Sequence, residues 1–255
     1  MKIVVFIKQV PDTDDVKWTE NNNIDRTRME SIMNPEDKSA IEAALTIKEK
    51  YTGKITAVSM GPKKAVEILQ EAIAMGVDEA KLLCDAKFAG SDTCATSRVL
   101  ASVIKKIYPD TDIILFGQTA IDGETGQTGI STAARLDYPC FSRVKEILDV
   151  KDGDITVLSD DTDAVIKYQA KLPVALCIHN SVYKPRLPLI EGYIKAQKYN
   201  YECLTIQDIG LDDTLSGIKG SPTYVSSVYK NTNKRDCKFV DNVEALKNEI
   251  DGVLK

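Results

Sequence analysis

The residue types that could do chemistry are concentrated in one loop, residues 118–128, which holds threonines, glutamines, carboxylates and glycines. Gly123, Gly126 and Gly129 follow a G-x-x-G-x-x-G spacing, which differs from the G-x-G-x-x-G fingerprint of dinucleotide-binding folds. A P-loop needs a Lys-Ser/Thr pair after its last glycine, and Ile130 and Ser131 follow here. Two interpretations stay open. The loop binds a phosphate or ribose, or it is only a tight connection, because glycine is favoured wherever φ must be positive.

Two carboxylates in this loop, Asp122 and Glu124, argue against a bare phosphate cradle, since carboxylates repel phosphate. They would suit ribose hydroxyls, or they would cap the loop's own backbone.

The chain offers no Ser/His/Asp or Cys/His set for nucleophilic catalysis, so we assign binding residues and no catalytic residue. The lone histidine, His179, cannot build a zinc site, and no metal site is predicted.

The loop lies between a predicted strand and a predicted helix. Residues 113–116 form a short apolar run typical of a buried strand, and residues 130–136 follow a helical pattern that Pro139 ends. This arrangement presents backbone N–H groups and a positive helix end to an anionic ligand. Upstream, strands are predicted at 2–7, 54–60 and 79–84, and helices at 35–51, 62–75 and 91–108. The alternation predicts an α/β fold with a doubly wound, mainly parallel, Rossmann-like sheet.

The first predicted helix has a strong entry signal. Asn34 can cap it, and Pro35 fits its first turn. Glu36 and Asp37 favour its positive end. Because this entry follows one strand and precedes the next, it lies where α/β sheets open their ligand crevice.

After Pro139 the pattern changes. Segments 142–150 and 155–159 flank the turn signal Asp152-Gly153-Asp154, which predicts a hairpin. Strands at 164–171 and 173–178 are expected to return to the sheet, followed by a proline-containing loop at 184–192 and a short helix at 193–199. We therefore place a nucleotide-binding α/β domain at 1–200.

The remaining segment, 201–255, is predicted to be a C-terminal arm. Its apolar periodicity is thin, with a brief β-like stretch at 224–229 and an amphipathic helix at 242–254. An arm of this length without its own core must pack on its own domain or on a partner subunit. A small surface hairpin is expected around Trp18 and residues 21–25.

Composition excludes several classes of protein. The net charge of −5 argues against a general nucleic-acid surface. The apolar run at 3–7 is too short for a signal peptide, and no stretch approaches the roughly 18 apolar residues of a membrane span, so no membrane insertion is expected. Six scattered cysteines without a C-x-x-C motif indicate reduced, mostly buried thiols and a cytoplasmic location.

The sequence resembles the beta (small) subunit of electron-transferring flavoproteins over nearly its whole length. The resemblance is carried by KIVVFIKQVPDT (2–13), NPEDKSAIEAAL (34–45), AVSMGPKKAVEILQEAIAMG (57–76) and GQTAIDGETGQTG (117–129), with a weaker fifth segment, PRLPLIEGYIKAQK (185–198). Together these segments are highly specific, although none is persuasive alone.

The resemblance implies a heterodimer with a larger alpha subunit that carries its own flavin. The beta subunit would bind an adenine nucleotide, which is AMP in simple electron shuttles and a second FAD in flavin-bifurcating members. The binding residues implied by the resemblance are Phe6, Asn34, Pro35, Glu36, Asp37, Met60, Gly117, Gln118, Asp122, Gly123, Thr125, Gly126, Gln127 and Thr128.

The forms KQVPDT and A-I-D-G-x-T-x-Q resemble the bifurcating group, which is typical of anaerobic metabolism. NADH would then reduce the FAD bound here. One electron would pass through the alpha-subunit flavin to a dehydrogenase of the acyl-CoA or 2-hydroxy-acid type, and the other to ferredoxin. The alternative is a non-bifurcating subunit with a structural AMP. An adenylating or ATP-hydrolysing enzyme ranks low, because KQVPDT stands where such enzymes need Ser-Gly-Gly-x-Asp-Ser.

Residues 185–198 correspond to the loop with which the shuttles dock their dehydrogenase. The apolar anchor would be Ile190, with Leu189 beside it. The alternative is a loop that folds back on its own core. Arg186 and Lys195 are candidates for steering an acidic partner, although exposed basic side chains are usually only solvated.

Overall fold

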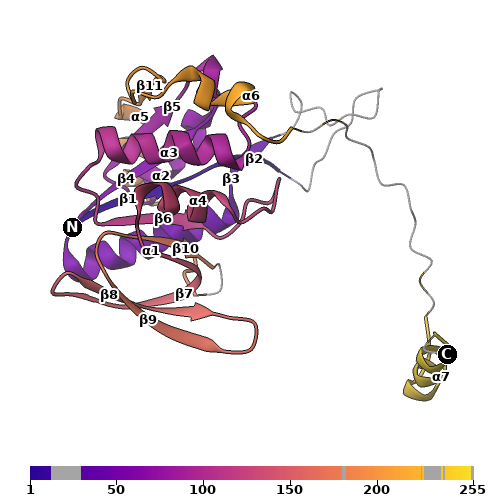
Figure 1. The fold of residues 1–255 in the computed structure, drawn as a ribbon. Coiled ribbons are helices and arrows are strands. Elements are labelled where there is room, and N and C mark those ends of the chain that lie inside the picture. The colour runs from indigo at the N-terminus through magenta and orange to yellow at the C-terminus, as the bar shows by residue number, and fades with distance from the viewer. Residues whose placement is uncertain (13–29, 180–181, 225, 227–236, 238, 254–255) are drawn as a thin grey trace.

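The computed structural model describes residues 1–12, 30–179, 182–224, 226, 237 and 239–253 (Figure 1). The hairpin predicted around Trp18, and all but two residues of the β-like stretch predicted at 224–229, lie outside these ranges. No helix in the described ranges is long and apolar enough to cross a membrane.

In the described ranges, a nine-stranded sheet forms the centre of the fold. Its order is β11 (Glu202–Leu204), β5 (Glu79–Leu83), β4 (Lys54–Met60), β1 (Lys2–Phe6), β6 (Ile113–Gly117), β10 (Val174–Ile178), β7 (Cys140–Lys151), β8 (Asp154–Asp160) and β9 (Val165–Lys171). The first seven strands of this order are parallel, and β8 and β9 continue antiparallel from β7. A separate antiparallel ribbon joins β2 (Gln9–Pro11) to β3 (Ser31–Met33).

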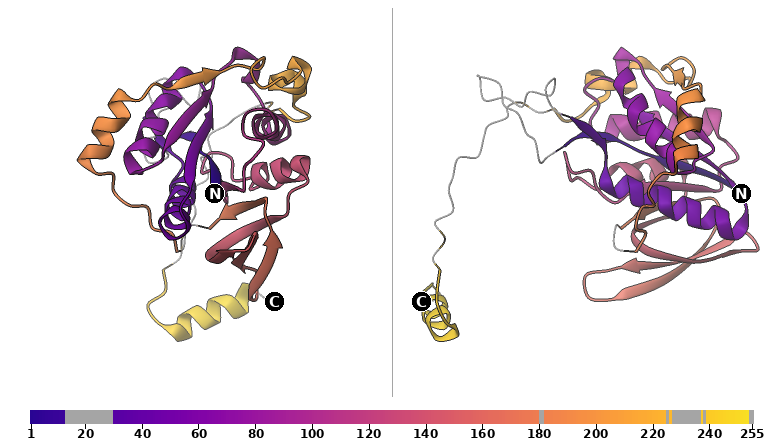
Figure 2. Two further views of the ribbon diagram at one scale, coloured as in Figure 1. Left: turned by 90° about the vertical axis from the view of Figure 1, so that its left-hand side faces the viewer. Right: turned by 180° about the vertical axis from the view of Figure 1, so that it is seen from behind.

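Helices cover both faces of the sheet (Figures 1 and 2). On one face, Ile3 and Val5 of β1 belong to the core that includes α1 (Pro35–Tyr51), α2 (Val66–Met75) and α5 (Ile190–Lys198). On the other, Val4 and Phe6 belong to the core that includes α3 (Thr93–Ile107) and α4 (Thr128–Leu136). Burial on both faces explains why β1 reads as a continuous apolar run. The predicted doubly wound, mainly parallel sheet is thus confirmed.

The sheet changes winding direction between β1 and β6. The chain builds β1, β4 and β5 outward in one direction, and then α3 leads to β6 on the other side of β1. Neighbouring connections therefore diverge above the carboxyl ends of β1 and β6. In open α/β sheets this switch point is where a ligand crevice forms.

Some boundaries differ from the sequence prediction. The helix α4 begins at Thr128 instead of residue 130, so Gly129 lies inside it. A Cβ at Gly129 would come within 2.6 Å of the Cys177 sulfur, so the close packing requires glycine despite its poor helix propensity. The helix α5 begins at Ile190, which shortens the predicted loop at 184–192. The helix predicted from residue 62 starts with a 3₁₀ turn, η2 (Lys63–Ala65).

The predicted domain boundary after residue 200 does not coincide with the end of the sheet. Residues 202–204 form β11, which pairs with β5, and Ile206 and Ile209 are buried in the same core as α3. The strand escaped prediction because three residues at a sheet edge show no periodicity. Short helices complete this region: η3 (Ala86–Phe88), η4 (Asp213–Leu215) and α6 (Gly217–Gly220).

The last helix, α7 (Val243–Val253), confirms the amphipathic prediction and is drawn well away from the α/β body in Figure 1. Val243 is 82% exposed, and Leu246 and Ile250 are about half exposed. The packing of the arm on a partner stays a prediction.

The expectation of mostly buried cysteines is wrong: Cys177 is buried, Cys203 and Cys237 are exposed, and the other three are half-buried. Apolar surroundings therefore protect few of these thiols.

A glycine substitution tests the packing of α5 on α2. A Cβ at Gly192 would lie 2.2 Å from the Ala74 carbonyl oxygen, so Gly192→Ala must separate the two helices. We expect a loss of about 1–3 kcal/mol in the free energy of unfolding, measured by denaturant titration. The control is Gly252→Ala in α7, where nothing lies within 4 Å. Equal stability of the two variants would contradict this packing.

Candidate functional site

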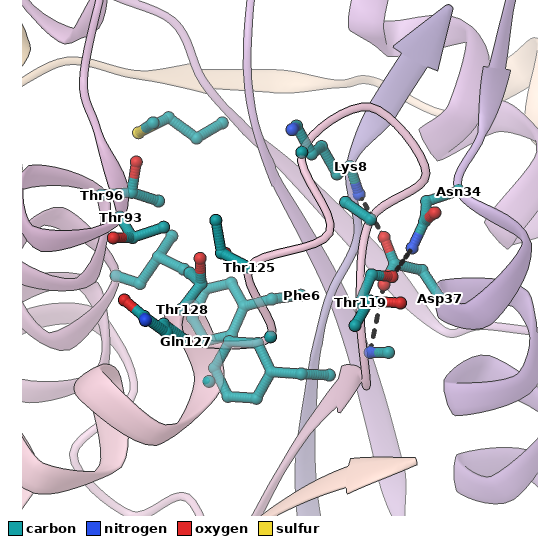
Figure 3. A pocket seen from close by; sticks show the side chains of 18 of the residues that line it. Phe6, Lys8, Asn34, Asp37, Thr93, Thr96, Thr119, Thr125, Gln127 and Thr128 are labelled. Carbon is teal, nitrogen blue, oxygen red and sulfur yellow. Dashed lines mark hydrogen bonds between the residues drawn. The ribbon is translucent and has the colours of Figure 1, made fainter. Parts of the chain in front are cut away.

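A cavity of about 500 Å³ opens at the carboxyl edge of the sheet, at the switch point between β1 and β6. It lies between α3 and α4 on one side and the start of α1 on the other, with the loop 118–127 around it (Figure 3). Thr93 and Thr96 of α3 face Lys8 and Asn34 across the opening in this view. Its volume falls in the range of roughly 300–1,000 Å³ that is typical of small-molecule sites.

Two stacked aromatic rings line the cavity. The rings of Phe6 and Phe116 have centroids 5.1 Å apart and an interplanar angle of 22°. Both side chains are buried, and Val58 and Leu100 line the same apolar part of the cavity. This surface can bury a flat apolar ring system, because aromatic faces pack well against other planar rings.

The buried carboxylate of Asp37 joins three elements below the opening. It accepts hydrogen bonds from the backbone N–H of Lys8, at 2.7 Å, and of Gly117, at 3.1 Å. These two residues follow β1 and end β6, so one side chain ties both strand ends to α1. Burial raises the pKa of the Asp37 carboxyl to about 7, while the hydrogen bonds from Lys8, Asn34 and Gly117 oppose the shift.

Side chains from the start of α1 hold the loop. The Nδ2 of Asn34 donates to the carbonyl oxygen of Thr119, at 2.8 Å, and its Oδ1 accepts from the N–H of Ile121. The carboxylate of Glu36 accepts from both the N–H and the hydroxyl of Thr119. Asn34 therefore occupies the predicted cap position without making a side-chain cap bond, because its amide is used to fix the loop.

An ion pair between Lys8 and Asp122 holds the same loop at a second point. The Lys8 ammonium lies 2.6 Å from Asp122 Oδ1 and 2.7 Å from Oδ2. Because half of the Lys8 side chain is exposed, the pair adds little stability and mainly sets the position of the loop. Of the two roles expected for Asp122, ribose binding or capping of its own loop, the structure shows neither, and its carboxylate binds Lys8, two residues beyond β1.

Two glycines of the site are required for different reasons. A Cβ at Gly117 would lie 2.4 Å from Asp37 Oδ1, so a larger residue would displace the carboxylate that ties the strands together. Gly126 is different. It has φ of +61°, a conformation that non-glycine residues rarely adopt, and its Cβ would meet only ordinary contacts.

The start of α4 points its backbone donors toward the cavity. Its N-cap residue, Gln127, makes no side-chain cap bond, and Gln127, Thr128 and Gly129 all line the cavity. The N-terminal N–H groups of α4 are thus available to an anion, which the helix dipole also favours. The hydroxyls of Thr93, Thr96 and Thr125 line the same space.

Most of the predicted binding residues line this cavity: Phe6, Asn34, Asp37, Met60, Gly117, Gln118, Gly123, Thr125, Gly126, Gln127 and Thr128. Pro35, Glu36 and Asp122 are not among the lining residues. Pro35 occupies the first turn of α1, and the other two hold the loop from behind. Whether the lining residues bind a ligand stays a prediction.

Sequence reasoning missed the contribution of α3 and of the C-terminal segment. Ser91, Asp92, Thr93 and Thr96 line the cavity, as does Thr223. Asp92 caps α3 through the N–H of Ala95 and also accepts from the N–H and hydroxyl of Thr223. The helix start at 91–92 was a usable signal, since helices that follow parallel strands begin at the carboxyl edge. No local pattern marked Thr223.

The predicted docking residues lie on the face that carries α1, α2 and α5. Leu189 is 73% exposed and Ile190 is 79% exposed, so the alternative in which they fold into the core of this chain is wrong for both side chains. Leu187 is also exposed, and Ile190 begins α5. Their role in docking stays a prediction.

Comparison with known proteins gives matches over nearly the whole chain. The profile of the Electron transfer flavoprotein domain family matches residues 22–202. The chain is 39% identical over 255 residues to the electron transfer flavoprotein subunit beta of Thermoanaerobacterium thermosaccharolyticum, covering 98% of this chain and 97% of that protein. It is also 39% identical to the corresponding subunit of Megasphaera elsdenii, over 90% and 87% of the two chains. A third relative, 39% identical over 88% and 86%, is the caffeyl-CoA reductase-Etf complex subunit CarD of Acetobacterium woodii.

The buried Asp37 predicts a specific pH dependence of stability. Its pKa is raised from 3.8 to about 7 on folding, so the folded chain binds this proton more tightly than the unfolded chain. The stabilisation is fully present below pH 4 and is lost as the pH rises through about 7, by up to about 4 kcal/mol. Asp37→Asn should flatten this part of the curve of unfolding free energy against pH. Parallel curves for the two proteins would contradict the shift.

Proposed function

The chain belongs to the electron transfer flavoprotein family as a relative of its beta subunits, and we propose that its cavity binds FAD in a flavin-bifurcating complex. The observation that carries the proposal is the cavity at the β1–β6 switch point, where an apolar aromatic surface lies next to an uncapped helix N-terminus. An adenine nucleotide needs both features, because it joins a flat ring to a polyanion.

The chain's own residues would hold the ligand by non-covalent contacts. The rings of Phe6 and Phe116 and the side chain of Leu100 offer apolar contact to the base. The backbone N–H groups at the start of α4 and the hydroxyl of Thr128 would bind phosphate oxygens. Glu124 lines the cavity and suits ribose hydroxyls, as expected for a carboxylate in this loop.

The small residues of the loop favour FAD over AMP. Gly123 has nothing within 4 Å of its Cβ position, and Gly126 adopts a positive φ that glycine accepts without strain. Such a loop lets backbone groups approach a diphosphate, which FAD has and AMP lacks. The alternative ligand is AMP, which would bind in the same cavity. In that case AMP would be structural, and the alpha subunit would carry out all of the redox chemistry.

When bound, FAD would supply the redox chemistry, accepting a hydride from NADH and delivering electrons singly. The protein would bind and orient it. Asp37 and Asn34 would fix the strand ends and loop that shape the site, and Phe6 and Phe116 would exclude water from the adenosine end. None of the lining side chains is assigned an acid or base role.

The proposal includes partners. A larger alpha subunit with its own flavin would complete a cytoplasmic heterodimer, with the C-terminal part of the arm, and α7 above all, packing on it. A relative is named as part of a caffeyl-CoA reductase-Etf complex, which supports an acyl-CoA-type dehydrogenase as one electron acceptor; a 2-hydroxy-acid dehydrogenase would fit equally. Ferredoxin would receive the other electron.

Counting nucleotides in the purified heterodimer tests the ligand. We expect two flavins per heterodimer for the unchanged protein and one for Thr96→Phe, because Thr96 lines the cavity from α3 and a phenyl ring there would occupy part of the space that the ligand needs. The matched control is Thr46→Phe on the exposed side of α1, which should keep two. One flavin with released AMP in the unchanged protein would favour the alternative ligand. Unchanged nucleotide content in Thr96→Phe would remove the cavity from the site.

A second substitution tests docking through the exposed segment. Ile190→Ala should raise the KM of a purified acyl-CoA dehydrogenase for the heterodimer by roughly five- to thirtyfold, which corresponds to about 1–2 kcal/mol for an apolar anchor. Flavin content should stay the same, since Ile190 does not line the cavity. Val165→Ala serves as the control, because Val165 is also exposed but lies on the edge strand β9. Identical KM values for the two variants would refute the anchor.

A further inference from the structure

Arg186 ties the segment that carries the exposed apolar residues to α1. The Nη2 of Arg186 lies 2.7 Å from Glu42 Oε1, and its Nε lies 2.9 Å from Glu42 Oε2. The backbone N–H of Arg186 donates to the same carboxylate, at 3.0 Å. The Nη1 donates to Glu49 at 2.6 Å, two turns further along α1. One side chain and one backbone group thus fix this point of the chain against two glutamates.

These bonds differ from an ordinary surface ion pair. The Glu42 side chain is only 13% exposed, so water competes weakly for its oxygens. Two N–H groups of the guanidinium meet the two oxygens of Glu42 in a bidentate arrangement, which fixes orientation as well as distance. The two glutamates raise the pKa of Arg186 above its ordinary value, as expected for a cation held between carboxylates.

The other end of the segment is fixed against α2. Gly192 is in close contact with the Ala74 backbone, and the Lys195 ammonium lies 3.3 Å from the carbonyl oxygen of Val77. Figure 2 shows α5, in orange, alongside the purple helices of this face. Between the two attachments lie residues 187–190, the docking segment, in which Leu187 is 89% exposed and Pro188 is half-buried.

We infer that Arg186 is a positioning residue that fixes the docking segment in its partner-binding conformation before the partner dehydrogenase arrives. The inference rests on the proposed docking role of Leu189 and Ile190. A flexible segment loses conformational freedom on binding, whereas a segment already fixed at both ends does not, and this difference appears as affinity. The chain thereby exposes apolar side chains to water in a fixed arrangement, which a self-contained domain has no reason to do.

This role differs from the direct steering of an acidic partner that the sequence alone suggested for Arg186. The guanidinium already binds Glu42 and Glu49, so binding a partner carboxylate would compete with these bonds. Lys195, the second steering candidate, contacts a backbone carbonyl of its own chain. Removing Glu42 therefore separates the two roles: it would free Arg186 for a partner, but it would loosen the docking segment.

The test uses the co-expressed heterodimer and starts from the variants Arg186→Gln, Glu42→Gln and Lys38→Gln. The last is the matched control, because Lys38 also makes an ion pair from α1, to Glu71 at 2.6 Å, without touching the segment. Amide hydrogen exchange over residues 186–194 reports the order of the segment, and the KM of a purified flavin-dependent acyl-CoA dehydrogenase for the heterodimer reports docking. Flavin content is measured throughout.

We expect Arg186→Gln and Glu42→Gln each to speed exchange in the segment at least tenfold and to raise KM roughly tenfold with kcat and flavin content unchanged. Lys38→Gln should match the unchanged protein. Arg186→Lys should resemble Arg186→Gln, because an ammonium cannot reproduce the bidentate contact. Adding Ile190→Ala to Arg186→Gln should raise KM little beyond Ile190→Ala alone, since the arginine acts through that anchor.

Two results would overturn the inference. One is unchanged hydrogen exchange in Arg186→Gln. The other is a KM that rises in Arg186→Gln and not in Glu42→Gln, which would mean that the arginine contacts the partner directly. If Ile190→Ala itself leaves KM unchanged, the proposed docking role fails, and the inference fails with it; the exchange data then still show whether Arg186 orders the segment.

Discussion

The site depends on one buried carboxylate. Asp37 accepts backbone hydrogen bonds from Lys8, two residues beyond β1, and from Gly117, the last residue of β6. These two strands pair side by side but are followed by connections that diverge. Burial disfavours the ionised form of this carboxyl and raises its pKa to about 7, whereas the hydrogen bonds that it accepts offset part of the cost of burying the charge. The same constraint requires glycine at position 117, because a Cβ would lie 2.4 Å from the carboxylate oxygen.

Around this carboxylate, some residues line the cavity, and others fix the position of the loop without lining the cavity. Thr125 and Thr128 present hydroxyls to the cavity, whereas Glu36 and Asp122 bond to Thr119 and Lys8 and do not line it. The division follows from the position of α1. Side chains at its start bind the loop at Thr119, whereas the N-terminus of α4 has no side-chain cap bond and faces the cavity.

The sequence predicted the elements well wherever a periodic apolar pattern or a strong cap exists. Four strand–helix units, the helix start at Asn34 and eleven of the residues that line the cavity followed from such patterns and from the family resemblance. Three failures have distinct physical causes. β11 has three residues and no periodicity, α4 includes a glycine that only tertiary packing explains, and Thr223 reaches the cavity through a hydrogen bond to Asp92 that no local signal encodes. Arg186 and Glu42 are 144 positions apart, so no local sequence pattern could have predicted their pairing.

A single helix supports two separate structures. The first turn of α1 places Asp37 under the cavity, and Glu42 and Glu49 on the same helix hold Arg186. Both depend on the rotational register of α1, in which each residue advances about 100° around the axis. One amino acid inserted between Asp37 and Glu42 would turn the glutamate away from the arginine or the aspartate away from the strand ends. The length of this stretch is therefore fixed from both directions, so that an insertion or deletion there would uncouple the cavity from the arginine contact.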